Sequence, residues 1–174
     1  MKLASPNQAD RTSMWTAWRG QRARWFLVPL RVIVGFGFVA HGYAKLERGP
    51  DHFADVIAAI GLPMPELTAW VTTFVEVACG GALMFGLAVT VACAVSSVVM
   101  LTALFTVHLR YGFSSVRLVE LSHAGARFGP VGYEINLLYL GALVALAGAG
   151  PTPWSIDGWR RARLSRRQPA GEVD

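Results

Sequence analysis

The sequence predicts an all-α protein, a four-helix transmembrane bundle with short interfacial helices in its two outer loops. Three observations lead to this fold class. Of the 174 residues, 53% are hydrophobic and 16% are charged, whereas a soluble domain carries about a quarter charged residues. The charges gather in the termini and in two connecting segments. Between them lie four apolar stretches of a length typical of membrane-spanning helices.

The expected spans cover about residues 25–42, 67–86, 88–108 and 131–150. Together they define a membrane domain, residues 25–157, with a basic segment on either side. Residues 1–24 interleave arginines with tryptophans, so we expect a mostly disordered start followed by an anchor on an anionic membrane surface. Residues 158–174 form a basic tail that contains five arginines between Arg160 and Arg167.

The segments between the spans differ in length. Only Gly86 and Leu87 separate the second and third spans, which must therefore form a tight antiparallel hairpin. Residues 45–66 contain apolar side chains at helical spacing from Phe53 to Ile60, which predicts a short interfacial helix. Residues 109–130 are also partly apolar, and we expect this second outer loop to follow the membrane surface in the same way.

The distribution of positive charge predicts the orientation. Four spans bring both termini to the same side of the membrane. That side carries eleven of the sixteen lysines and arginines if Arg31 is included, and the two long loops carry five. Because positive charge is retained in the cytoplasm, the termini and the Gly86 turn are expected to be cytoplasmic. The net charge of +5 is then explained by orientation in the lipid bilayer and does not indicate a nucleic-acid partner.

The stretch from Arg31 to Leu46 combines an apolar helix with ionisable ends. At about 100° per residue, Arg31 and Lys45 lie on one stripe of this helix, and His41 lies beside the stripe. In one interpretation the cations reach outward to the lipid headgroups. In the other they turn inward and are paired or functional. The stripe consists of Arg31, Gly35, Phe38, Gly42 and Lys45.

Glu76 is the most costly residue in the expected spans. It precedes the Gly86 turn by about ten residues, which at 1.5 Å per residue places it about 15 Å deep, near the bilayer centre. A carboxylate at that depth is either paired or protonated. Arg31 comes within reach as a partner. Alternatively, the pair is purely structural, or a neutral Glu76 is hydrogen-bonded to Ser96 or Ser97 at similar depth.

A second set of polar residues gathers towards the outer side. It supplies imidazole, ammonium, carboxylate, amide and phenol groups, which could bind a quinone headgroup and exchange protons with it. The alternative is that ordinary hydrogen bonds tie four helix ends together. The set consists of His41, Lys45, His108, Glu134, Asn136 and Tyr139.

Other chemistry is weakly indicated. Cys79 and Cys93 lie at nearly equal depth, and they act either as small apolar side chains or as a bonded pair across the hairpin. The four histidines have no metal-ligand spacing, so no metal site is expected. Small residues such as Gly80 and Gly141 allow close helix packing, within one bundle or in a homo-oligomer.

Several motifs resemble the DoxX family of small four-span integral membrane proteins. The pattern R-x3-G-x2-F-x2-HG-x2-KL from Arg31 to Leu46 resembles the opening of that family. Also in keeping are GLPMP at 61–65, Glu76 with Gly80-Gly81, GYE at 132–134 and WSID at 154–157. The resemblance covers about residues 25–157. It implies a bacterial inner (cell) membrane protein similar to the membrane subunit of thiosulfate:quinone oxidoreductases, without a general catalytic residue set.

These observations lead to two functional hypotheses. The first is a redox-associated membrane subunit that interacts with quinone or with a soluble or membrane oxidoreductase partner. Its polar framework would be Arg31, His41, Lys45, Glu76, His108, Glu134, Asn136 and Tyr139. The alternative is a non-enzymatic scaffold or assembly factor that recruits a soluble partner through its basic termini. Whether the protein catalyses a reaction stays open at this point.

Overall fold

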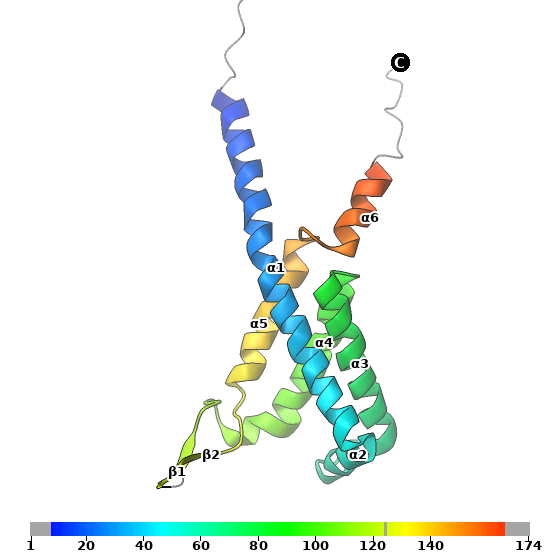
Figure 1. The fold of residues 1–174 in the computed structure, drawn as a ribbon, viewed down its shortest axis with the longest axis vertical. Helices are drawn as coiled ribbons and strands as arrows, with labels where there is room; N and C mark the ends of the chain where they lie inside the picture. The colour runs from blue at the N-terminus through cyan, green and yellow to red at the C-terminus, as the bar shows by residue number, and fades with distance from the viewer. Residues whose placement is uncertain (1–7, 124, 166–174) are drawn as a thin grey trace, which may run out of the picture.

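The computed structural model describes residues 8–123 and 125–165, with side chains from residue 23 onwards. The chain is mostly helical (Figure 1). Helix α1 covers Gln8–Arg48, α2 Pro50–Ala59, α3 Pro65–Phe85 and α4 Val89–Ala103. A π-helical turn, Leu104–His108, and a 3-10 turn, Leu109–Tyr111, continue α4. Strands β1 (Leu118–Ser122) and β2 (Gly125–Phe128) precede α5 (Glu134–Ala149) and α6 (Ile156–Ser165).

Three helical stretches are long and apolar enough to cross a membrane: Ala23–Arg48, Pro65–Phe85 and Val89–Tyr111. Their outer faces carry large exposed apolar side chains, among them Phe36, Phe74 and Val98. Such faces suit lipid better than water. The expected first three spans are thus confirmed as apolar helices. The fourth expected span, residues 131–150, contains the shorter apolar helix α5.

The ends of the first span differ from the expectation. Helix α1 begins at Gln8 and runs without interruption into the span, so the expectation of a mostly disordered start was wrong from residue 8 onwards. Nothing breaks the helix there, because residues 8–28 contain no proline and are rich in helix-forming residues. Residues 1–7, and the side chains of Trp15 and Trp18 that were expected to form the anchor, lie outside the described part.

The two outer loops do not match each other. The first contains α2, as predicted. The second forms a two-stranded antiparallel hairpin, β1–β2, so the expectation of a second interfacial helix was wrong. Residues 116–121 alternate apolar and charged side chains over part of their length, and Gly125 supplies a turn residue with φ +123°. Alternation and a glycine turn favour a hairpin over a helix.

The helices pack through glycines and a small apolar core. A side chain at Gly35 would meet the Gly80 carbonyl at 2.6 Å, and a side chain at Gly80 would meet the Gly35 carbonyl at the same distance. Helices α1 and α3 therefore touch backbone to backbone, as close helix pairs in membranes do. The core beside this contact draws on four helices and contains Val34, Phe38, Leu83, Val89, Ala92, Cys93, Leu143 and Leu146.

The two adjacent glycines of α3 provide a test of this packing. Gly80→Ala should destabilise the fold by about 1–3 kcal/mol, because the methyl group would press on the α1 backbone. Gly81 has no atom within 4 Å of an added Cβ, so Gly81→Ala should stabilise the helix by about 0.5–1 kcal/mol. Thermal unfolding in one detergent checks both changes. Equal melting temperatures for the two variants would contradict the contact.

Candidate functional site

A partly buried ion pair joins the end of α1 to the middle of α3. Lys45 near the end of α1 donates hydrogen bonds to both carboxylate oxygens of Glu76 in the middle of α3. The Glu76 side chain is 5% exposed and that of Lys45 is 20% exposed. The Phe53 ring of α2 lies over the ammonium group, with its centroid 4.7 Å from Nζ, and adds a cation–π contact. Of the two ion pairs among the described residues, this one is much the less exposed.

The local sequence explains why the pair forms. Gly42 stands one turn before Lys45 on α1, and an added Cβ there would lie 3.2 Å from the Glu76 Cβ and the Thr73 carbonyl. The glycine therefore lets α1 approach α3 closely enough for the lysine to turn inward. Lys45 does not reach outward to the headgroups, so the snorkelling interpretation was wrong for this residue. Glu76 is paired, as one alternative expected, but the partners named from the sequence, Arg31 and Ser96 or Ser97, were wrong.

Arg31 instead lies at the opposite end of the helices. It is 1% exposed, and it donates hydrogen bonds to the Thr152 hydroxyl at 2.7 Å and to the Trp154 carbonyl at 2.9 Å. Trp154 has a left-handed backbone, with φ +51°, which is uncommon for a bulky residue and needs support from its surroundings. We call residues 152–157 the C-terminal clasp, because they bind several helices at this end.

Asp157 completes the clasp. Its carboxylate accepts hydrogen bonds from the backbone N–H groups of Ala88 at 3.0 Å and Val89 at 3.1 Å. Its own N–H donates to the Gly86 carbonyl at 3.0 Å. The turn before α4 has no capping side chain of its own, so a residue far along the chain satisfies the first N–H groups of that helix. Sequence reasoning did not identify Thr152 or Asp157, although the WSID motif was the signal available.

Two of the outer candidates hold the second loop in place. Glu134 accepts a hydrogen bond from the Ser115 N–H at 3.0 Å. His108 bonds through Nδ1 to the Val131 carbonyl at 2.9 Å. Both contacts join the segment after α4 to the start of α5, so these side chains serve the loop, as the helix-end alternative expected.

The remaining candidates lie along α1, α4 and α5. Asn136 is 2% exposed and donates to the Met100 carbonyl at 3.4 Å. The Tyr139 ring packs edge-on against Phe38, with centroids 5.5 Å apart, and its hydroxyl group contacts Gly37. His41 is exposed. The structure therefore does not gather the whole outer set into one site.

The cysteines are both free thiols. Cys93 is 1% exposed within the apolar core, and Cys79 packs against the same core. They occupy the positions of small apolar side chains. Within the described residues, no group of three or more histidine, cysteine or acidic side chains is arranged to hold a metal ion.

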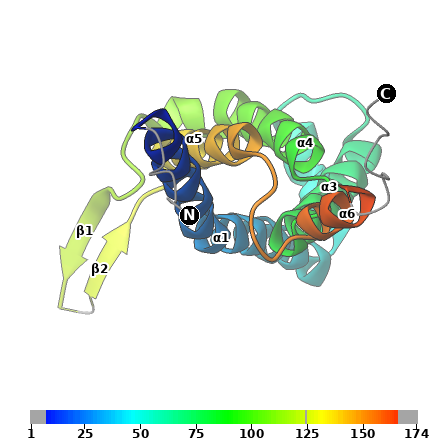
Figure 2. The same ribbon diagram turned by 90° about the horizontal axis from the view of Figure 1, so that it is seen from above.

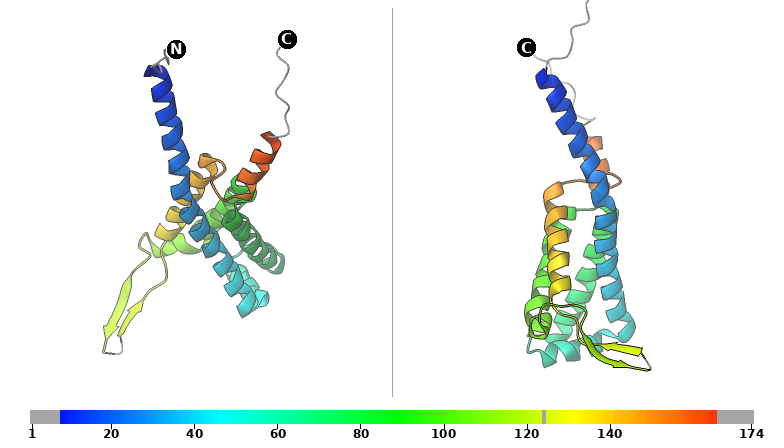
Figure 3. Two further views of the ribbon diagram at one scale, coloured as in Figure 1. Left: turned by 45° about the horizontal axis from the view of Figure 1, so that its top comes forward. Right: turned by 90° about the vertical axis from the view of Figure 1, so that its left-hand side faces the viewer.

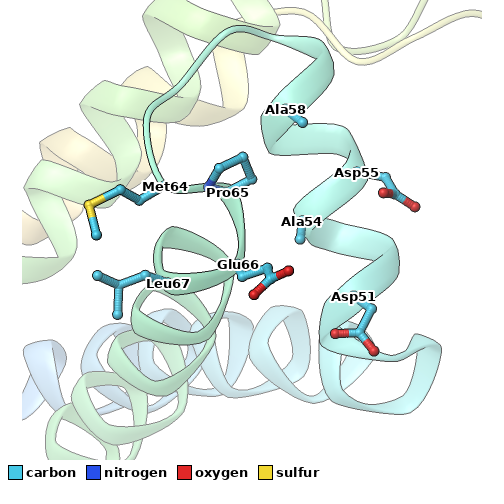
Figure 4. Close-up of a pocket in the computed structure, with 8 residues that line it drawn as sticks. All are labelled: Asp51, Ala54, Asp55, Ala58, Met64, Pro65, Glu66 and Leu67. Carbon is cyan, nitrogen blue, oxygen red and sulfur yellow. The ribbon is translucent and has the colours of Figure 1, made fainter.

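An open groove of about 510 Å³ lies between α2 and the start of α3 (Figure 4). Glu66 is directed towards α2 there, and Asp51 and Asp55 project from α2. The groove is acidic and lies beside the loop that precedes α3, and neither Lys45 nor Glu76 lines it. Its other lining residues are small or apolar: Ala54, Ala58, Met64, Pro65 and Leu67.

The fold and the buried pair define the class of the molecule, which is a helical membrane protein. Residues 26–109 match the DoxX family, and this part of the chain, which contains both Lys45 and Glu76, is a DoxX-family region. The resemblance identified from the sequence is thereby confirmed for residues 26–109. Comparison with characterised proteins and with solved structures gave no match.

The ion pair predicts that replacing Lys45 alone destabilises the protein more than replacing Lys45 and Glu76 together. Lys45→Met should cost about 3–5 kcal/mol of stability, because it leaves the Glu76 carboxylate buried without a partner. Adding Glu76→Leu should recover most of that loss, since an apolar pair removes the unpaired charge. Thermal unfolding in detergent or nanodiscs measures both. Additive losses in the double variant would show that the two side chains do not interact.

Proposed function

We propose that the protein is a four-span subunit of the bacterial inner membrane, with both termini cytoplasmic and α5 as the fourth span. The 16 residues of α5 measure about 24 Å, somewhat short of an average hydrocarbon core of about 30 Å. Its exposed face carries Leu138 and Val144, as a lipid-facing helix would. The start of α1 and α6 lie at one end of the molecule, and α2 and the β-hairpin lie at the other (Figures 1 and 3). Lys and Arg are concentrated at the first of these ends.

We further propose that this subunit is redox-associated and engages a quinone headgroup or a partner oxidoreductase beside the Lys45–Glu76 pair. The observation that carries the proposal is the pair itself. Two apolar side chains of similar volume would stabilise the fold at least as well as this ion pair. Stability alone therefore does not explain why charged residues stand here. Charged side chains within a membrane mark a functional site by default.

The ridge of α1 beside the pair offers groups that a quinone requires. Gly37, His41 and Lys45 follow one another at four-residue steps, so they lie along one ridge with a rise of about 6 Å per step. The Tyr139 hydroxyl contacts Gly37 at one end of the ridge, and Glu76 binds Lys45 at the other. His41 is exposed between them, on a surface that lipid-soluble molecules can approach.

These side chains suit the chemistry of a quinone headgroup. A bound quinone would take up two electrons and two protons, the electrons coming from the partner oxidoreductase. His41 and Tyr139 supply an imidazole and a phenol that can hydrogen-bond the two carbonyl oxygens and pass protons to them. The Lys45–Glu76 pair sets the local electrostatic field beside that position.

A specific observation also favours the alternative, a scaffold that recruits a soluble partner. Helix α6 exposes Arg160, Arg161 and Arg163, and Arg163 stacks on the Trp159 ring at 4.2 Å. An open groove of about 490 Å³ runs along this face. An acidic soluble protein would complement these charges. Arg166 and Arg167 belong to the same basic run but lie outside the described residues.

Quinone binding tests the leading proposal, with one histidine variant as the test and a second as its control. Short-chain ubiquinone or menaquinone analogues should raise the melting temperature of the detergent-purified wild type. His41→Ala should weaken binding about tenfold, the equivalent of one lost hydrogen bond of about 1.4 kcal/mol. His52→Ala removes an exposed histidine of α2 and should leave binding unchanged.

Deleting residues 158–174 in the same preparation separates the two functions, because the deletion leaves the Asp157 cap in place. Retained quinone binding by the truncated chain fits the redox subunit. If the wild type binds no quinone and carries none after lipid extraction, the quinone proposal is wrong. Loss of a co-purifying soluble protein on deletion would then favour the scaffold.

A further inference from the structure

The β1–β2 hairpin leaves the bundle as an arm. In Figure 2 it extends away from all the helices, and in Figures 1 and 3 it lies at the same end of the molecule as α2. All nine residues of its two strands are exposed. An isolated two-stranded hairpin is marginally stable in water. A contact outside the described chain would add to its stability.

The register divides the hairpin into two unlike faces. Residues directly opposite each other in an antiparallel pair share a face, and successive pairs alternate between faces. Glu120 faces Arg127, and the two form an ion pair at 3.5 Å. Ser122 and Gly125, two places further along the ladder, belong to the same polar face. The hairpin is therefore amphipathic, with its ion pair on one side.

The opposite face is apolar. The pairs Leu118–Phe128 and Leu121–Ala126 lie on it. A bulge between Leu118 and Glu120 adds one residue to β1. Leu118 therefore shares a face with Phe128, although it stands two residues before Glu120. The exposed fractions are 53% for Leu118, 75% for Leu121 and 57% for Phe128. No described residue of the chain covers this face.

The base of the hairpin holds the arm in a defined direction. Backbone hydrogen bonds continue beyond the strands, from Gly129 to Arg117 at 2.8 Å and from Tyr133 to Gly112 at 3.0 Å. The Ser115 N–H donates to the Glu134 side chain on the first turn of α5. Phe113 and Tyr133 pack edge-on with centroids 5.5 Å apart. The arm is thus attached to the ends of two apolar helices.

Resting on the orientation proposed above, we propose that the apolar face of this hairpin lies on the outer leaflet of the bilayer, with the Glu120–Arg127 face in water. A segment that leaves the end of a spanning helix sideways, away from the rest of the protein, extends over lipid. Aromatic residues at its base match the interfacial belts of membrane proteins. The free backbone edges of the strands require water, so the hairpin rests at the interface and does not enter the hydrocarbon.

Spin labels on the two faces test the proposal in nanodiscs. Leu121→Cys places a label on the apolar face, and Ser122→Cys places one on the polar face, in a chain with Cys79 and Cys93 replaced by alanine. The ratio of oxygen to nickel-complex collisions should be several-fold higher at position 121 than at position 122. If the alanine background does not keep a cooperative melting transition, a photoreactive benzoylphenylalanine at the same positions of the unaltered chain should form lipid adducts at 121 and not at 122.

Two other outcomes would overturn the proposal. Equal water exposure of both labels would show that the hairpin stands free of the membrane. Exclusion of both oxygen and the nickel complex at position 121, or protein adducts in place of lipid adducts, would show that a second copy or another protein covers the face.

Discussion

An acidic side chain buried among apolar helices requires a partner, and Lys45 is the partner of Glu76. Their electrostatic attraction operates in a medium of low dielectric constant, where a separated pair would be far more costly. The pair can form only where α1 and α3 approach backbone to backbone. Gly35, Gly42 and Gly80 make that approach possible, so the glycine contacts and the ion pair depend on each other.

Helix α1 connects two polar centres at opposite ends of the bundle. Arg31 binds the C-terminal clasp at one end, and Lys45 binds Glu76 towards the other. The clasp in turn caps α4 through Asp157. This arrangement fixes the rotation of α1 about its own axis. It thereby presents His41 and Gly37 on the ridge where we propose that a quinone binds.

The sequence predicted those features that composition and periodicity control. The second and third spans follow from the length of their apolar stretches. The tight turn between them follows from the single helix-breaking residue, Gly86. The partner of Glu76 could not be predicted, because it depends on how two helices are rotated against each other. Shape complementarity at Gly42 decides this, and helical spacing alone does not reveal it. The role of Asp157 was hidden for a similar reason, since the N–H groups that it caps lie about 69 residues earlier in the chain.

The protonation state of Glu76 in a membrane tests the central claim most directly. Isotope-edited infrared difference spectra compare the wild type with Glu76→Gln, both in lipid nanodiscs. They show whether the carboxyl group that the substitution removes is ionised or protonated. The structure predicts loss of the stretching bands of an ionised carboxylate. Loss of a protonated carboxyl band from the wild type would contradict the ion pair.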